Sequence, residues 1–115
     1  MGNYNSLMEI LGGFHLWAVS RLKRSWNLEK KYQILLRHLE AMMSPNANYA
    51  NYRKILAKRA AALEAGVPTL PYLGLFLKDL TFIEDGNADM IDDKRLNFDK
   101  IAMIGNTLRS IQAYQ

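Results

Sequence analysis

The stretch that decides the fold lies between Pro71 and Asn87 and has the sequence PYLGLFLKDLTFIEDGN. Residues 72–83 are almost entirely apolar, except for Lys78, Asp79 and Thr81. An apolar run of this length, bounded by a proline and by the turn residues of EDGN, predicts a buried helix. The preceding connector, residues 67–71, contains two prolines and is expected to be stiff and extended, because residues before proline avoid the helical region.

Helical periodicity continues on both sides of this stretch, and no segment shows sustained alternation of apolar and polar residues. Ser44-Pro45-Asn46 and Gly66 are expected to stop two of the helices. We predict helices over residues 3–14, 16–26, 27–43, 49–66, 72–83 and 97–111, with a polar loop over residues 88–96. The fold class is therefore all-α.

Asparagines mark several expected helix starts, since their side chains can accept a hydrogen bond from the free N–H groups of the first turn. Asn3 or Asn5 would cap the first helix, Asn27 the third and Asn97 the last. Gly12-Gly13 is expected to weaken and end the first helix.

Composition narrows the class of protein. The 115 residues support one domain, half of them are hydrophobic, and cysteine is absent, which excludes disulfides, thiolate–metal sites and a cysteine nucleophile. No apolar run approaches the roughly 18 residues of a membrane span, and the sequence MGNYNSLMEI does not resemble a signal peptide. We therefore expect a soluble cytoplasmic protein.

Charge is unevenly distributed along the chain. Residues 1–66 carry ten basic and four acidic side chains, net +6, whereas residues 67–115 carry five and seven, net −2. The cations are spread over several helical patterns, so we expect no specific nucleic-acid binding, because charge alone gives only non-specific affinity. An acidic protein partner or a position near a membrane is equally compatible with this charge.

Motifs for covalent chemistry are missing. The sequence has no phosphate-binding glycine loop and no nucleophilic serine elbow, and nothing brings His15 and His38 together with a ligand set. The acidic residues between Asp89 and Asp93 lack the glycine and the closing glutamate of a calcium loop. We expect neither a metal nor a cofactor.

The run from Pro71 to Asn87 closely resembles a motif near the end of the catalytic domain of Ras-family guanine nucleotide exchange factors, the Cdc25-homology domain. Further segments resemble that family in the same order along the chain. They are Asn3–Met8 (NYNSLM), Ala18–Trp26 (AVSRLKRSW), Met43-Ser44-Pro45, Asn48–Arg53 (NYANYR), Leu96–Lys100 (LNFDK) and Ile111–Gln115 (IQAYQ).

This resemblance implies an irregular helical bundle with a protruding helical hairpin, whose first arm is the helix over residues 72–87 and whose second arm begins at Phe98. It implies a guanine nucleotide exchange factor for a Ras- or Rap-type small GTPase. The hairpin would open the nucleotide site and disrupt Mg²⁺ and phosphate binding. Exchange of this kind makes no covalent bond, so the chain would not be an enzyme in the chemical sense.

The resemblance also assigns roles to residues. Thr81 would lie near the Mg²⁺ site, and Asp85, four residues on and on the same helix face, would compete with phosphate for the P-loop. The family usually has glutamate at the position of Asp85, so Glu84 is an alternative competitor. Residues expected to contact the GTPase are Asn51, Tyr52, Arg53, Tyr72, Lys78 and Asn87. For Tyr52, inward packing on its helix is an equally open interpretation.

The resemblance covers essentially the whole chain but only about half of the family domain. Residues 1–115 would then be a single domain or a half-domain, with a helical core over 3–66 and the connector and hairpin over 67–115. The alternative function is a GTPase-binding or scaffold module without independent exchange activity. Besides the GTPase, expected partners are the missing N-terminal half of the domain or a second copy of the chain. A membrane would be reached at its inner face, only through the GTPase.

Overall fold

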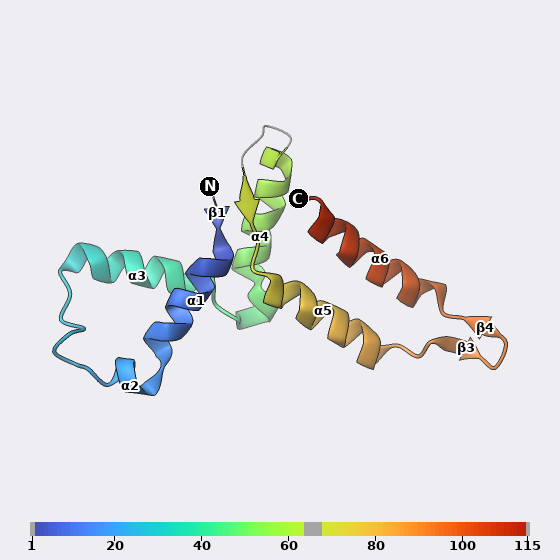
Figure 1. Ribbon diagram of the computed structural model, residues 1–115, viewed down its shortest axis with the longest axis horizontal. Coiled ribbons are helices and arrows are strands. Elements are labelled where there is room, and N and C mark those ends of the chain that lie inside the picture. Colours follow the sequence, from blue (N-terminus) through green and yellow to red (C-terminus); the bar gives the residue numbers. More distant parts are fainter. Residues whose placement is uncertain (1, 64–67, 115) are drawn as a thin grey trace.

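The computed structural model describes residues 2–63 and 68–114, which form six helices and four very short strands (Figure 1). The helices are α1 (Tyr4–His15), α2 (Trp17–Ser20), α3 (Lys30–Met42), α4 (Asn46–Leu63), α5 (Leu73–Gly86) and α6 (Phe98–Gln112). The strands are β1 (Gly2–Asn3), β2 (Thr69–Leu70), β3 (Met90–Asp92) and β4 (Arg95–Leu96). The predicted all-α class is confirmed, because the strands are only two or three residues long.

The molecule is elongated, with extents of 63 × 37 × 19 Å. Helix α4 stands at the middle, α1 to α3 extend to one side, and α5 and α6 project to the other as a helical hairpin (Figure 1). The radius of gyration is 18.3 Å, whereas a compact domain of this length has about 13 Å. Much of the surface that a compact domain would bury is therefore exposed.

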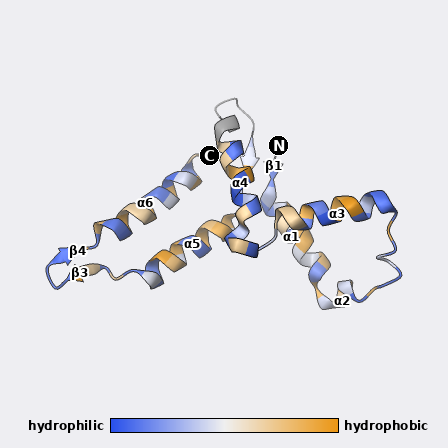
Figure 2. Cartoon of the chain, turned by 180° about the vertical axis from the view of Figure 1, so that it is seen from behind, coloured by the Kyte–Doolittle hydropathy of each residue, from blue (hydrophilic) through white to orange (hydrophobic). Residues whose placement is uncertain are grey.

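The core lies at the junction of these two sides. It consists of seven buried hydrophobic residues from α1, α4, α5 and the end of α3: Tyr4, Leu11, Met43, Tyr52, Leu56, Leu75 and Phe76. In contrast, nineteen large hydrophobic residues of the described ranges are exposed. Apolar turns are visible along α3 and α5 in Figure 2. The core thus ties the two arms together but leaves their outer faces uncovered.

The N-terminus is joined to the base of the hairpin. Strand β1 pairs in parallel with β2, with Gly2 opposite Thr69, and the N–H of Gly2 donates to the carbonyl of Pro68 at 3.1 Å. The predicted extended connector is thus confirmed at Thr69–Leu70, the two residues of β2. The predicted helix end at Gly66, and Val67 at the boundary between the two expected segments, lie outside the described residues.

Two helix predictions in the N-terminal part were wrong. Helix α1 continues through Gly12 and Gly13 to His15, and the N–H of Leu16 still donates to the carbonyl of Gly13 at 3.3 Å. The helix predicted over 16–26 is helical only at Trp17–Ser20, and turns follow it. Helix α3 begins after Glu29 without a side-chain cap, so Asn27 does not cap it.

Two other asparagine caps are confirmed. The carboxamide oxygen of Asn3 accepts from the N–H of Ser6 at 3.0 Å, and that of Asn97 accepts from the N–H of Lys100 at 3.1 Å. Asn97 also donates to the carbonyl of Ala88 at 2.9 Å. This residue therefore starts α6 and fastens it to the chain that leaves α5.

The polar loop predicted over residues 88–96 is instead a small antiparallel β-hairpin at the tip of the helical hairpin, formed by β3 and β4. The carboxylate of Asp92 accepts hydrogen bonds from the N–H groups of Lys94 and Arg95, at 3.1 and 2.9 Å. It also pairs with the Arg95 side chain at 2.7 Å. A side chain that closes its own turn in this way is not visible as sequence alternation, which explains the missed strands.

Candidate functional site

The distal part of α5 carries two of the three predicted exchange residues on one face. The side chains of Thr81 and Asp85 are exposed and four residues apart, so they share a face of the helix. The hydroxyl of Thr81 donates to the carbonyl of Leu77 at 3.0 Å. The carboxylate of Asp85 makes no hydrogen bond or ion pair within residues 2–63 and 68–114. Asp85 is thus an accessible carboxylate with no partner among these residues.

Glu84 has a different environment. Its carboxylate lies 3.0 Å from the ammonium of Lys100, which also contacts the carboxylate of Asp89 at 2.6 Å. The side chain of Lys100 is only 5% exposed and reaches the Glu84 carbonyl as well, at 3.4 Å. The hydrogen bond to Asp89 raises the pKa of Lys100; burial opposes this, and Glu84 adds to it. Lys100 therefore joins both arms of the hairpin and holds the Glu84 carboxylate in an ion pair.

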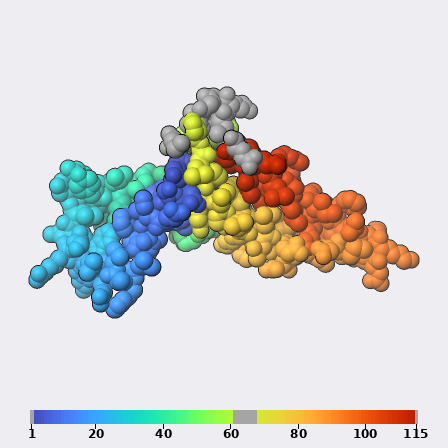
Figure 3. Space-filling model, in the orientation of Figure 1, coloured from blue at the N-terminus to red at the C-terminus, as the bar shows by residue number. Residues whose placement is uncertain are grey.

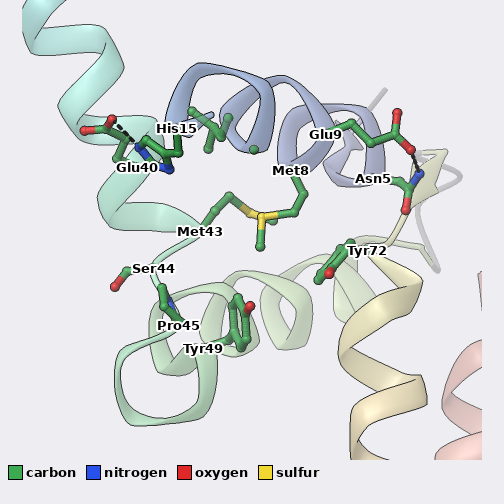
Figure 4. A pocket seen from close by; sticks show the side chains of 12 residues that line it. Asn5, Met8, Glu9, His15, Glu40, Met43, Ser44, Pro45, Tyr49 and Tyr72 are labelled. Atoms are coloured by element: carbon green, nitrogen blue, oxygen red, sulfur yellow. Dashed lines mark hydrogen bonds and ion pairs between the residues drawn. The ribbon is translucent and has the colours of Figure 1, made fainter. Parts of the chain in front are cut away.

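A pocket of about 680 Å³ lies at the base of the hairpin, between α1, the α3–α4 turn and the start of α5 (Figure 4). Its walls are largely apolar and include Met8, Leu11, Met43, Pro45, Tyr49 and Tyr72. The rings of Tyr49 and Tyr72 are 6.3 Å apart. A pocket with these walls can bury an apolar or aromatic side chain from a partner.

The polar rim of this pocket is fixed by two pairs. The carboxamide of Asn5 donates to Glu9 at 2.7 Å, and the Nε2 atom of His15 lies 3.1 Å from the carboxylate of Glu40 (Figure 4). The second pair joins the end of α1 to α3, and thereby holds one side of the pocket in place. Sequence reasoning placed segments 3–8, 43–45 and 48–53 in the resemblance but assigned no role to Met8, Met43 or Tyr49.

Tyr49 stands at a left-handed turn. Ala47, Asn48 and Tyr49 have φ values of 48°, 53° and 59°, a region that non-glycine residues seldom adopt. The regular part of α4 therefore begins after Tyr49. This turn sets the direction in which α4 leaves α3 and places the Tyr49 ring on the pocket wall.

The three residues of α4 that were predicted to contact a partner have unequal exposure. Asn51 is exposed, and its carboxamide donates to the Ala41 carbonyl at 3.0 Å. Tyr52 is fully buried, so the inward-packing interpretation describes it and it belongs to the core. Arg53 is half-buried and pairs with Asp79 of α5 at 2.7 Å. Arg53 therefore connects α4 to the hairpin.

The remaining predicted contact residues lie on α5 and its two ends. Tyr72 is half-buried and precedes the first turn of α5 on the pocket wall. The ammonium of Lys78 is exposed and lies 5.6 and 5.2 Å from the ring centres of Tyr49 and Phe82. Asn87 follows α5 and donates to the Ile83 carbonyl at 2.9 Å. Asn87 thus shapes the end of this helix.

The structure brings Tyr72, Lys78 and Tyr49 together near the base of the hairpin, whereas Thr81, Glu84 and Asp85 lie towards its tip. Leu75 and Phe76 are buried as the apolar pattern predicted, whereas Leu77 is 62% exposed.

Across residues 2–63 and 68–114, no group of three or more His, Asp or Glu side chains could hold a metal ion. No helix of these ranges is both long enough and apolar enough to cross a bilayer.

Comparison with known proteins agrees with this geometry. Residues 1–102 match the RasGEF domain family. The chain is 40% identical over 116 aligned residues to Ras guanine nucleotide exchange factor Y of Dictyostelium discoideum, covering 100% of the chain and 7% of that relative. It is 36% identical over 117 residues to exchange factor M of the same organism, covering 100% of the chain and 12% of that relative.

A mammalian relative is similar at nearly the same level. Ras-specific guanine nucleotide-releasing factor 1 of Mus musculus is 34% identical over 114 residues, covering 98% of the chain and 9% of the relative. The chain thus spans about a tenth of the length of the curated relatives that it matches. On the family match, the full-length similarity and the projecting helical hairpin, this chain belongs to the RasGEF domain family.

Proposed function

We propose that this chain acts on a Ras-type small GTPase and accelerates release of its bound guanine nucleotide without covalent chemistry. The observation that carries this proposal is the projecting hairpin of α5 and α6. It presents the carboxylate of Asp85, which has no partner among residues 2–63 and 68–114, beside Thr81. Membership of the RasGEF family and relatives named as Ras guanine nucleotide exchange factors support it.

The thermodynamic requirement is differential binding. A partner releases nucleotide only if it binds the nucleotide-free GTPase more tightly than the loaded form, and the two ligands then weaken each other equally. A rigid wedge with a free carboxylate meets this requirement, because it can occupy space and hydrogen-bond donors that phosphate otherwise uses. No covalent bond is made or broken in this step.

Asp85 is the better candidate for the competing carboxylate. Glu84 is held by the Lys100 ammonium at 3.0 Å, and separating them would cost that ion pair. Asp85 is one methylene shorter than the glutamate usual in the family but needs no such separation. Thr81, one turn earlier on the same face, would lie beside it near the Mg²⁺ site.

The pocket at the base of the hairpin would supply affinity. Its apolar walls around Tyr49 and Tyr72 would bury one apolar or aromatic side chain of the GTPase. Lys78, Asn51 and Asn87 would add polar contacts around this anchor, as is usual where a buried side chain is ringed by polar groups. Under this proposal, Arg53 orients α5 through Asp79.

Release of fluorescent GDP from a panel of Ras and Rap GTPases tests the proposal, with the chain in excess. The wild-type chain should accelerate release for at least one of them. Asp85→Asn should lower the rate of GDP release about tenfold, because a hydrogen bond to a charged group contributes roughly 1.5 kcal/mol. Glu84→Gln removes one negative charge from the neighbouring residue, as a matched control, and should lower the rate of GDP release much less.

Two results would count against this assignment. A larger loss with Glu84→Gln than with Asp85→Asn would move the competing role to Glu84. No acceleration of any GTPase by a sample with the expected helical circular dichroism would end the proposal of independent exchange activity.

A binding or scaffold module without exchange activity is the second candidate, and the open shape of the molecule favours it. The radius of gyration of 18.3 Å and the many exposed apolar side chains leave surface for the other half of a family domain or for a second copy. Retention of nucleotide-free GTPase on the immobilised chain, without faster GDP release, is the result expected of such a module.

A further inference from the structure

The end of the molecule opposite the hairpin tip has a surface that the exchange proposal does not use. We define it as the basic end, residues 16–31, which comprise α2, the turns that lead to α3 and the first two residues of α3. It carries five cations and one carboxylate: Arg21, Lys23, Arg24, Lys30, Lys31 and Glu29. All six of these side chains are exposed. Within the described ranges 2–63 and 68–114, the one ion pair among them joins Lys31 to Glu29 at 3.0 Å. The net charge of this short segment is +4.

Apolar side chains stand among these cations. Trp17 is 74% exposed, Leu16 61% and Leu22 48%, which is unusual for such large residues. The guanidinium of Arg21 lies 4.6 Å from the centre of the Trp17 ring. The basic end therefore presents an aromatic and aliphatic tip whose immediate neighbours are positive.

This tip is held in place from behind. The indole N–H of Trp26 donates to the Val19 carbonyl at 2.9 Å, and the rings of Trp26 and Phe14 meet edge to face at 5.4 Å. Trp26 is half-buried, so it anchors the turns against the end of α1. Because Trp26 fixes the backbone, the outward position of Trp17 and Leu16 is part of the fold.

The combination selects among partners of negative charge. A nucleic-acid duplex would be bound through its phosphates by the cations and gives no role to exposed leucines. An anionic bilayer uses both features, since indole and leucine side chains enter the headgroup boundary while Lys and Arg pair with lipid phosphates and carboxylates. We propose that the basic end docks directly on an anionic lipid bilayer.

The position of the basic end fits this role. It forms one end of the long axis of the molecule, and the tip of the hairpin forms the other (Figure 3). Docking there would leave Asp85 and the hairpin free. This goes beyond membrane contact through the GTPase, and it holds or fails independently of the exchange activity.

Co-sedimentation with vesicles tests the proposal. The wild-type chain should bind vesicles of phosphatidylcholine mixed with phosphatidylserine, much less those of phosphatidylcholine alone, and salt should weaken the binding. Lys23→Gln with Arg24→Gln should lower affinity about 25-fold, at about fivefold for each cation. The matched control, Lys94→Gln with Arg95→Gln, removes the same charge at the hairpin tip and should lose far less.

Tryptophan fluorescence gives a second readout that does not depend on net charge. Insertion of Trp17 should shift the emission of the wild-type chain to shorter wavelength on adding phosphatidylserine vesicles. The Trp17→Phe variant retains only Trp26, which is already half-buried, and should show almost no shift.

Three outcomes would overturn the proposal. They are equal losses from the two double variants, no blue shift in wild-type protein that sediments with the vesicles, and no binding to anionic vesicles at low salt. Tighter binding to duplex DNA than to phosphatidylserine vesicles, unaffected by Trp17→Phe, would instead assign the basic end to nucleic acid.

Discussion

The phenolic oxygen of Tyr52 accepts a hydrogen bond of 2.7 Å from the backbone N–H of Tyr72. Tyr52 is fully buried in α4, with its ring 5.3 Å from that of Tyr4, and Tyr72 stands immediately before α5. An N–H at a helix start has no partner within the helix, so the tyrosine supplies one from the core. This bond fixes the base of the hairpin to the centre of the molecule.

Replacing Tyr52 with phenylalanine should therefore lower the free energy of unfolding by about 1–3 kcal/mol, because the N–H of Tyr72 would lose its acceptor. Urea denaturation followed by circular dichroism measures this difference. Tyr32→Phe removes a hydroxyl from a tyrosine that is 49% exposed and should change stability little. Equal stability of the two variants would mean that water replaces the lost acceptor.

Stability should also fall at alkaline pH. Burial raises the pKa of Tyr52 from its ordinary value of 10.0 to about 12. The folded chain then holds this proton more tightly than the unfolded chain, so the contribution is complete below pH 10 and lost as the pH rises to 12. The loss should be on the order of 2 kcal/mol.

Two other groups act in the same direction at alkaline pH. Burial raises the pKa of Tyr114, and the hydrogen bond to Asp89 raises that of Lys100. Urea denaturation at a series of pH values measures the total slope, and Tyr52→Phe should make the decline between pH 10 and pH 12 shallower. An unchanged slope in this variant would assign the decline to the other groups.

Gly74→Ala should separate binding from stability. A Cβ atom at position 74 would clash with the ring of Tyr72, which forms a wall of the pocket. The ring would have to move, so affinity for the GTPase should fall several-fold. Helical alanine gains up to about 1 kcal/mol over glycine, which should offset part of the strain.

Gly105→Ala is the matched control for this substitution. Position 105 lies in α6, and no atom would meet its Cβ within 4 Å. This variant should gain stability and bind as the wild type does. Calorimetric titration of nucleotide-free GTPase with both variants measures the difference, and equal affinities would show that Tyr72 need not keep its position.

Lys100→Met should loosen the hairpin tip rather than unfold the chain. The ammonium of Lys100 joins Glu84 at the end of α5 to Asp89 in the connecting segment, and both carboxylates are largely exposed. Water can solvate these carboxylates once the cation is removed, so the global cost should be small. The link between the two arms would nevertheless be lost.

Amide hydrogen exchange measures this effect. In Lys100→Met, the amides of β3, β4 and the end of α5 should exchange several-fold faster, with those of α4 unchanged. Lys94→Met changes an exposed lysine of the same tip and should leave the exchange pattern almost as in the wild type. Protection that stays the same in Lys100→Met would show that the caps at Asn97 suffice.

The sequence alone predicted the all-α fold class, and its resemblance to the exchange-factor family implied the projecting hairpin. The apolar run over 72–83 is long and bounded by prolines and turn residues, and Asn97 caps α6 through a contact three residues away. Such signals depend only on neighbouring residues, so they can be interpreted without knowing how the rest of the chain packs. The segments at 3–8, 71–87 and 96–100 were likewise sufficient to identify the family.

Only the tertiary structure decided how the site is divided among its residues. Glu84 and Asp85 are neighbours of similar chemistry, and the difference between them arises from Lys100, which is sixteen residues from Glu84 and meets it only because α6 folds back on α5. The inward position of Tyr52 and the pocket between Met8, Met43 and Tyr72 likewise depend on contacts between distant segments. A periodic pattern reports which face of one helix is apolar, but the partner across that face is set by the packing of the whole chain.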